Sequence, residues 1–360
     1  MLPADLPAKR IMRLFIVLLL VGLHLCACQE DKRVKEVDAF FTMEDFGPAI
    51  RLKGEILPMD SIWKPARIRV EDSLLILTDM TCDYFIQVYD KRTGKKQTEN
   101  LSRGSGPGEL MYCWSTQYDK DKVWAFDMQM ARLNEYARDS FLTGWHVQPQ
   151  RSLHLQGAPT TVAALPDGTF IGSSLSDKET LFTRYDSNGR KDSSFNMPYP
   201  EVDYDIPEIK KKDFWEHRIY YSPRHRKVVV FYTYTDLIEI YDEQMKRERR
   251  VQGPDQFGPE FGIRNIEGGY VMIKPQKGIS KLSYISGVLT DTEMWTLYRG
   301  CWPTDGNDAR QTLLVFDYEG NPLRHYELDM SVQDYAIDEE ERCIYALTEH
   351  PDPVVVRYPY

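Results

Sequence analysis

Cysteine is scarce in this chain: six of its 360 residues are Cys, too few for a fold held by a dense set of disulfides. A basic excess is also missing, since 45 Lys and Arg face 55 Asp and Glu and the net charge is -10. This balance excludes a protein that neutralises nucleic-acid phosphates across a broad basic face. Long stretches of helical periodicity are few, whereas 21 prolines, 22 glycines and 22 tyrosines are present. The composition therefore favours an all-β fold of many short strands and turns.

Familiar catalytic and cofactor motifs are missing as well. The chain has no G-x-S-x-G nucleophile elbow, no P-loop, no G-x-G-x-x-G that opens a helix, no H-E-x-x-H and no EF-hand loop. His217 and His225 lie close in sequence, and neither has a partner at the i+4 spacing of a helical metal site. We therefore assign no catalytic residue, metal ligand or cofactor.

The N-terminus reads as an export signal. The basic residues Lys9, Arg10 and Arg13 precede the apolar run Leu14–Leu23, and small residues follow that run. The run is too short to span a bilayer, which requires roughly 20 apolar residues. Translation could begin at Met1 or at Met12, and the predicted compartment is the same in both cases.

The end of this signal, Leu25-Cys26-Ala27-Cys28, resembles the bacterial lipobox, in which the final cysteine is acylated. We expect a signal peptide over residues 1–27, a lipid on Cys28 and a tether over 28–48; an ordinary secretory signal with an incidental cysteine is the alternative. The acidic Gln29-Glu30-Asp31 resembles the export signal of surface lipoproteins, although a solvated tether explains it equally well. The predicted location is the outer membrane, with the lipid as the only membrane contact.

A strand pair recurs six times along the rest of the chain, at a spacing of roughly 50 residues. The first strand of each pair is a short apolar run, at Leu74–Asp79, Lys122–Asp127, Thr169–Ser174, Lys227–Tyr232, Met294–Arg299 and Cys343–Thr348. The second often ends in an aromatic residue and Asp, at Tyr84–Asp90, Arg132–Ala137, Thr180–Asp186, Asp236–Asp242, Thr312–Asp317 and Pro353–Tyr358. Six such units predict a six-bladed β-propeller over residues 49–360 with four antiparallel strands in each blade.

The innermost and outermost strands are predicted around these pairs. Innermost strands fit Pro65–Asp72, Cys113–Asp121, Thr160–Asp167 and Val332–Glu341, and outermost strands fit Lys95–Leu101, Phe141–Val147, Lys191–Met197, Lys246–Gln252 and Leu323–Met330. The sixth blade runs out of chain at Tyr360, so we expect Ala49–Ile56 to complete it and close the ring. A β-sandwich followed by a second β domain is the competing architecture.

The segment Arg103-Gly104-Ser105-Gly106-Pro107-Gly108-Glu109-Leu110 lies between the first and second predicted blades. Together with the lipobox and the Tyr-Asp strand ends, it resembles the TolB-like six-bladed propeller lipoproteins of Gram-negative gut bacteria. A looser copy, Phe257-Gly258-Pro259-Glu260-Phe261, follows the fourth blade. The resemblance implies a fold and a cellular location, and it implies no catalytic residues. The glycines give a sharp strand crossing the backbone room it needs; alternatively, Glu109 and Glu260 project into the ring mouth.

Two long insertions, Tyr199–Arg224 and Gly300–Gln311, are predicted on the face where second strands turn into third strands. Aromatic side chains beside charged ones suit stacking on a sugar ring or anchoring a protein. The candidate ligand-binding residues are Arg103, Glu109, Trp215, His217, Arg218, Tyr220, Tyr221, Glu260, Trp302 and Asp305. A lid that packs on itself over the channel is the structural alternative.

The sequence thus favours a monomeric, non-catalytic envelope lipoprotein that binds a partner protein or an oligosaccharide. The alternative is a carbohydrate-active or other hydrolytic propeller that uses Glu109, Glu260 or Asp305 as acid and base. The remaining cysteines, Cys82, Cys113, Cys301 and Cys343, allow three disulfide pairings or four free thiols.

Overall fold

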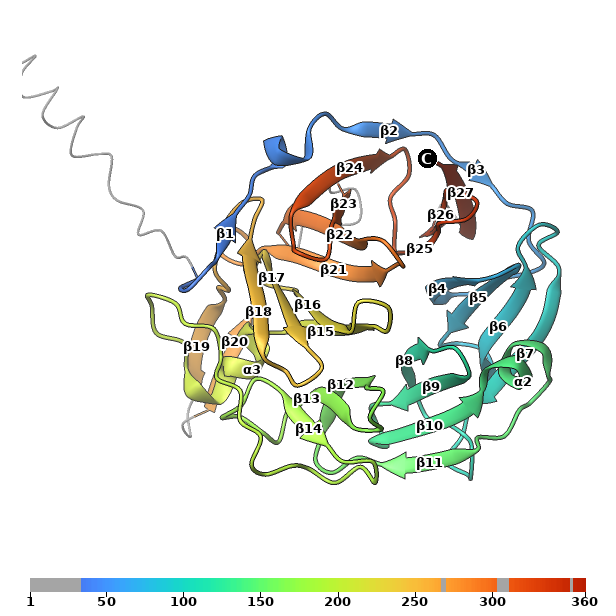
Figure 1. The fold of residues 1–360 in the computed structure, drawn as a ribbon, viewed down its shortest axis with the longest axis horizontal. Coiled ribbons are helices and arrows are strands. Elements are labelled where there is room, and N and C mark those ends of the chain that lie inside the picture. The colour runs from blue at the N-terminus through green and yellow to red at the C-terminus, as the bar shows by residue number, and fades with distance from the viewer. Residues whose placement is uncertain (1–33, 267–269, 303–310, 350–351) are drawn as a thin grey trace, which may run out of the picture.

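The computed structural model describes residues 34–266, 270–302, 311–349 and 352–360. Six blade-like sheets surround a central axis in a closed ring (Figure 1). The prediction of a mostly β, six-bladed propeller is confirmed. The export signal, Cys28 and Asp305 lie outside the described residues. Within the described part of the chain, no helix has the length and apolar character needed to cross a bilayer.

Each blade begins with a strand next to the axis and continues outward. Blade 1 contains β4 (Pro65–Glu71), β5 (Leu74–Asp79), β6 (Tyr84–Asp90) and β7 (Lys96–Ser102). Blade 2 contains β8 (Cys113–Tyr118), β9 (Lys122–Asp127), β10 (Arg132–Ala137) and β11 (Arg151–His154). Blade 3 contains β12 (Pro159–Ala164), β13 (Phe170–Ser174) and β14 (Thr183–Tyr185).

The second half of the chain repeats this order. Blade 4 contains β15 (His217–Ser222), β16 (Lys227–Tyr232), β17 (Leu237–Asp242) and β18 (Arg247–Gln252). Blade 5 contains β21 (Leu282–Leu289), β22 (Met294–Cys301), β23 (Thr312–Phe316) and β24 (Pro322–Leu328). Blade 6 contains β25 (Asp334–Asp338), β26 (Cys343–Glu349) and β27 (Pro353–Pro359). Along the chain, a hairpin of β19 (Gly262–Ile266) and β20 (Tyr270–Lys274) comes between blades 4 and 5.

The N-terminal segment runs around the outside of blades 4, 5 and 6 (Figure 1, blue). Strands β1 (Ala39–Phe40) and β2 (Ile50–Leu52) add parallel fifth strands to blades 4 and 5, and β3 (Glu55–Ile56) is the fourth strand of blade 6. The expected closure by Ala49–Ile56 is therefore divided between two blades. Residues 34–48 of the expected tether lie on the propeller, where Phe41 is buried and so is Phe46 of the short helix η1 (Met43–Phe46). The rest of the expected tether, residues 28–33, lies outside the described residues.

Six clusters of buried side chains hold the ring together, one between each pair of neighbouring blades. In β16, Val228 and Val230 face blade 3, whereas Val229 and Phe231 face blade 5. Successive residues of a strand point to opposite faces, and both faces of a blade meet a neighbour. This explains why the middle strands are continuous apolar runs and do not alternate with polar residues.

Three predicted details were wrong. Residues 141–147 are not an outer strand: α2 (Arg138–Thr143) starts there and β11 follows at Arg151. Blade 3 has no outer strand over 191–197, where a single bridge joins Lys191 to Tyr185. The insertion before blade 4 is shorter than expected, because η2 (Glu208–Lys210) and α3 (Lys211–Phe214) lead directly into β15. Cys82, Cys113, Cys301 and Cys343 are free thiols.

Candidate functional site

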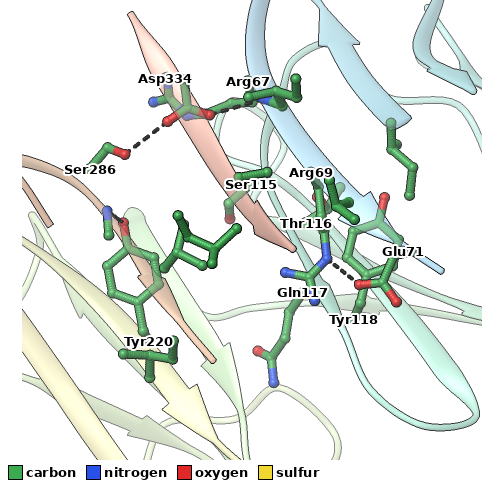
Figure 2. A pocket seen from close by; sticks show the side chains of 18 of the residues that line it. Arg67, Arg69, Glu71, Ser115, Thr116, Gln117, Tyr118, Tyr220, Ser286 and Asp334 are labelled. Atoms are coloured by element: carbon green, nitrogen blue, oxygen red, sulfur yellow. Dashed lines mark hydrogen bonds and ion pairs between the residues drawn. The ribbon is translucent and has the colours of Figure 1, made fainter. Parts of the chain in front are cut away.

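The innermost strands of all six blades line a central cavity of about 580 Å³, named here the axial cavity. It extends along β4, β8, β12, β15, β21 and β25 to the turns that join first and second strands, at Asp72, Pro223, Asp291 and Glu339. This end is opposite to the face on which the sequence placed the ligand. Close-ups show side chains from these strands converging on one space (Figure 2).

Strand β4 carries three of the charged side chains in the lining. Arg67, Arg69 and Glu71 occupy alternate positions and line the cavity, while Ile68 between them is packed in the core between blades 6 and 1. The two-residue period of a strand places the three charged side chains on one face. Charged and apolar residues therefore alternate along this inner strand.

One wall of the cavity is held by ion pairs. Arg69 donates to Oε1 of Glu71, and Arg138 of α2 donates to Oε2 at 2.8 Å, so both carboxylate oxygens of Glu71 are engaged. The Arg69 guanidinium also lies 4.5 Å from the centre of the Tyr118 ring. Burial raises the pKa of Tyr118, which keeps this phenol neutral. This wall is preorganised, and its charges are balanced within the protein.

The opposite part of the cavity centres on Asp334 of β25. Its carboxylate accepts hydrogen bonds from the Ile68 amide at 3.0 Å and from the Ser286 hydroxyl at 2.9 Å, and so links blades 1, 5 and 6. Burial raises the pKa of Asp334, while the charges of Arg67 and Arg218 act in the opposite direction. Two guanidinium groups and one carboxylate therefore share this region.

Neither of these two arginines forms an ion pair within 4 Å in the described residues. Arg67 donates to the carbonyl of Ala66 at 2.8 Å, and the buried Nε of Arg218 has no hydrogen-bond partner. Both charges also act on the Tyr220 hydroxyl, which accepts a hydrogen bond from the Gly287 amide at 2.9 Å. Arg67 and Arg218, named here the arginine pair, thus come from opposite blades to one region of the cavity.

Uncharged polar groups complete the lining. Ser115, Thr116 and Gln117 follow one another on β8, and Thr161 adds a hydroxyl from β12. Gln117 is fixed, because its amide donates to the Ala164 carbonyl and accepts from the Ala164 amide at 2.9 and 2.8 Å. Hydroxyl groups, amides and tyrosine rings are the groups with which proteins bind sugars and other hydroxylated molecules.

Three of the predicted site residues line the cavity: Arg218, Tyr220 and Tyr221, all on β15. Trp215 and His217 do not, because they are buried between blades 3 and 4, where Trp215 is 1% exposed. The Nδ1 of His217 donates to the Trp215 carbonyl at 2.7 Å, and burial lowers its pKa to about 4. These two side chains support the fold.

Arg103 and Glu109 of the glycine-rich segment form hydrogen bonds with backbone groups near their own loop. Glu109 Oε2 accepts a hydrogen bond from the Gly106 amide at 2.8 Å. Arg103 donates to the carbonyls of Met80 and Cys82 and lies over the Phe85 ring. The segment joins blade 1 to blade 2, and neither charged side chain lines the axial cavity.

Glu260 and Trp302 also lie away from the axial cavity. The charge of Glu260 adds to burial in raising the pKa of Tyr204, whose hydroxyl donates to the Pro259 carbonyl at 2.6 Å. The Nζ of Lys281 lies 5.8 Å from the centre of the Trp302 ring. Glu260 and Trp302 therefore do not form one site with the predicted residues of β15.

A second cavity of about 460 Å³ lies on blade 1, beside Trp63, whose side chain is 73% exposed. Its polar groups bind one another. Asp79 accepts from the amides of Lys64 and Thr81 at 2.6 and 2.7 Å, and Lys96 pairs with Glu99. In the described residues, no group of three His, Cys, Asp or Glu side chains could hold a metal ion.

A closed ring of six blades around a polar axial cavity defines the six-bladed β-propeller class. The chain belongs to the family described as TolB-like 6-blade propeller-like, which matches residues 45–340. No curated protein matches the chain in sequence.

Two solved structures share the fold. One, from Bacteroides fragilis, is described as a "putative exported protein"; it has 12% sequence identity and a TM-score of 0.53, with 89% of this chain and 98% of that one covered. The other is a member of the DUF4221 family from Bacteroides vulgatus, with 9% identity, a TM-score of 0.53, and 87% and 96% covered. At these identities the likeness concerns the fold alone.

Proposed function

We infer that this protein is an exported lipoprotein that binds an oligosaccharide in its axial cavity without converting it. The observation that carries this proposal is the cavity itself, whose lining combines hydroxyls, amides, tyrosine rings and two unpaired guanidiniums. Its volume of about 580 Å³ falls in the range of small-ligand sites. A concave pocket of this size suits the end of a glycan better than the surface of a folded partner.

The proposed export and lipid anchoring are supported by the first 28 residues, and export is also supported by a relative. The basic residues, the apolar run and the Cys at position 28 have the order of a lipoprotein signal. The Bacteroides fragilis protein of the same fold is described as exported. A lipid on Cys28 followed by a short tether would leave the propeller free in water beside the membrane.

Three carboxylates on the inner strands β4 and β25 are already engaged, which supports binding over hydrolysis. Both oxygens of Glu71 pair with arginines, Asp334 accepts two hydrogen bonds, and Asp338 pairs with Lys91 at 2.5 Å. A paired-carboxylate glycosidase needs one carboxyl group that delivers a proton and a second that is free to attack or to activate water. Neither Glu109 nor Glu260 lines this cavity.

A glycan array tests the proposal with the protein from Glu30 onward. The unmodified protein should retain a set of related glycans, and Ser115→Trp should lose them, because the new indole fills the cavity beside β8. Ser193→Trp is the matched control, since Ser193 is exposed and lies outside the lining residues. Equal binding by all three proteins, or by none, would refute the axial site. The appearance of new reducing ends on a bound glycan would instead identify a hydrolase.

A further inference from the structure

We propose that the ligand of the axial cavity carries a carboxylate, as a uronic acid does, and that Arg67 and Arg218 bind this group. The inference rests on the proposed function and extends it by naming the ligand class. It begins from an imbalance in the cavity: the arginine pair has fewer partners than the other buried or half-buried charges around it.

Comparison with neighbouring arginines makes the imbalance clear. Arg69 and Arg138 share the two oxygens of Glu71, and Arg138 also lies 3.1 Å from Asp72. For Arg67 and Arg218, no described carboxylate lies within ion-pair distance. Five N–H groups on each guanidinium can donate, and a buried donor without an acceptor is rare in folded proteins. The buried Nε of Arg218 is such a donor.

The charge count points to an anion. Arg67 and Arg218 bring two positive charges to a region where Asp334 is the carboxylate on which both act. Asp334 accepts one hydrogen bond on each oxygen, from Ile68 and Ser286, and neither guanidinium lies within ion-pair distance of it. Glu216 also acts on Arg218 but lies outside the cavity lining, so within the cavity one monoanion would offset the charge that Asp334 leaves uncompensated. The cavity as a whole is not positive, because Asp72, Asp291, Asp338, Glu339 and Glu340 line the end at its turns. Asp338, Asp72 and Asp291 are paired with Lys91, Arg138 and Arg224, so the positive excess is local to the arginine pair.

The geometry favours a carboxylate joined to a hydroxylated ring. A guanidinium edge presents two parallel N–H groups that match the two oxygens of a carboxylate, and such pairs are among the strongest hydrogen bonds in proteins. The hydroxyls of Ser115, Thr116 and Thr161 lie along the same cavity and can meet sugar hydroxyls. The ring of Tyr221 offers an apolar face for the ring carbons.

The test measures the dissociation constants of matched oligosaccharides by calorimetry: oligogalacturonate, its neutral galactose counterpart and a sulfated galactose oligomer. The unmodified protein should bind oligogalacturonate at least tenfold more tightly than the neutral sugar. Arg67→Gln and Arg218→Gln should each weaken oligogalacturonate by about ten- to a hundredfold, the loss of one charged hydrogen-bonding partner, and leave the neutral sugar unchanged. Arg218→Lys should retain part of the affinity.

Arg92→Gln is the matched control, because Arg92 is exposed on the turn after β6, outside the cavity, and its loss should change nothing. If Arg218→Gln does not fold, Arg67→Gln and Arg218→Lys still decide the question. Equal affinity for acidic and neutral sugars would overturn this inference while the proposed function stood. Preference for the sulfated sugar would overturn the carboxylate assignment, and absence of binding to every glycan would overturn the proposed function itself.

Discussion

The ammonium group of Lys91 in blade 1 lies 2.5 Å from the Asp338 carboxylate in blade 6, and both side chains are buried. Lys91 also reaches Glu341 at 3.1 Å, and both hydrogen bonds raise its pKa, so that the amine stays charged. This ion pair joins the first blade to the last, beside the core cluster that the two blades share. It adds a polar link to the apolar packing that closes the ring.

Lys91→Met should therefore destabilise the propeller by about 3 kcal/mol, because it leaves the Asp338 carboxylate buried without its counter-ion. Urea unfolding followed by tryptophan fluorescence measures this. Arg224→Met is the control: its partner Asp291 lies at 2.8 Å but both side chains are mostly exposed, so the expected loss is below about 1 kcal/mol. Equal effects of the two variants would show that burial of the Lys91 pair is energetically unimportant.

The N-terminal segment should contribute to stability through Phe46. Its ring packs edge-on against Phe41 and Phe316, with centroids 5.7 and 5.3 Å away, and thereby ties the segment to blade 5. Phe46→Ala should lower the free energy of unfolding by about 3–5 kcal/mol, since it removes a buried ring and leaves a cavity. Phe40→Ala, at a residue 47% exposed, should have a much smaller effect. Similar losses at both positions would contradict the packing described here.

His217 should make stability depend on pH. Its native pKa is about 4 and its ordinary value is 6.5, so between these values the unfolded chain binds more protons than the folded one. Stability should therefore fall as the pH drops from about 6.5 to 4, by up to about 3 kcal/mol. His217→Gln should remove this part of the slope, whereas His154→Gln, on the exposed edge strand β11, should leave it intact. Denaturant midpoints from pH 4 to 7 provide the measurement.

The glycine-rich segment should prove to be structural. Gly108 has φ +78°, and a Cβ there would come within 2.6 Å of Gln148 and 2.9 Å of Pro149. Gly108→Ala should cost more than the roughly 1–2 kcal/mol of the left-handed conformation alone. Gly168→Ala isolates that conformational part, because Gly168 has φ +81° but open space around it. Glycan affinity should survive both changes if the variants remain folded; its loss in Gly108→Ala alone would assign the segment to the site.

The blade count could be predicted because the apolar runs of middle strands depend on local composition. Leu74–Asp79 and Lys227–Tyr232 are buried on both faces wherever their neighbours lie, so these segments are recognisable without knowledge of the partner blade. The outer strand of blade 2 was misplaced because α2 and the segment after it pack on blade 1. This tertiary contact cannot be recognised from the local pattern of apolar residues. Asn100, for example, donates to the Phe141 carbonyl at 2.8 Å.

The site was harder to predict than the blades. Tyr220, Tyr221 and Arg218 were found because aromatic and charged residues cluster on one short segment. Arg67, Glu71 and Asp334 were missed, although the strands that bear them were predicted. The alternation of Arg67, Arg69 and Glu71 with apolar residues was an available signal, since charged residues on one face of an otherwise buried strand indicate a polar axis.

Local patterns along the chain were enough to establish six repeated sheets, an acidic β protein and a lipoprotein-like N-terminus. Which charged side chains meet in the axial cavity depends on ring closure, because Arg67 and Arg218 belong to blades 1 and 4 and line one cavity only across the axis. The same closure determines that Glu71 is neutralised while the arginine pair has no carboxylate within ion-pair distance. Interactions between residues so distant in sequence are a property of the assembled ring, where burial and charge balance depend on every blade at once.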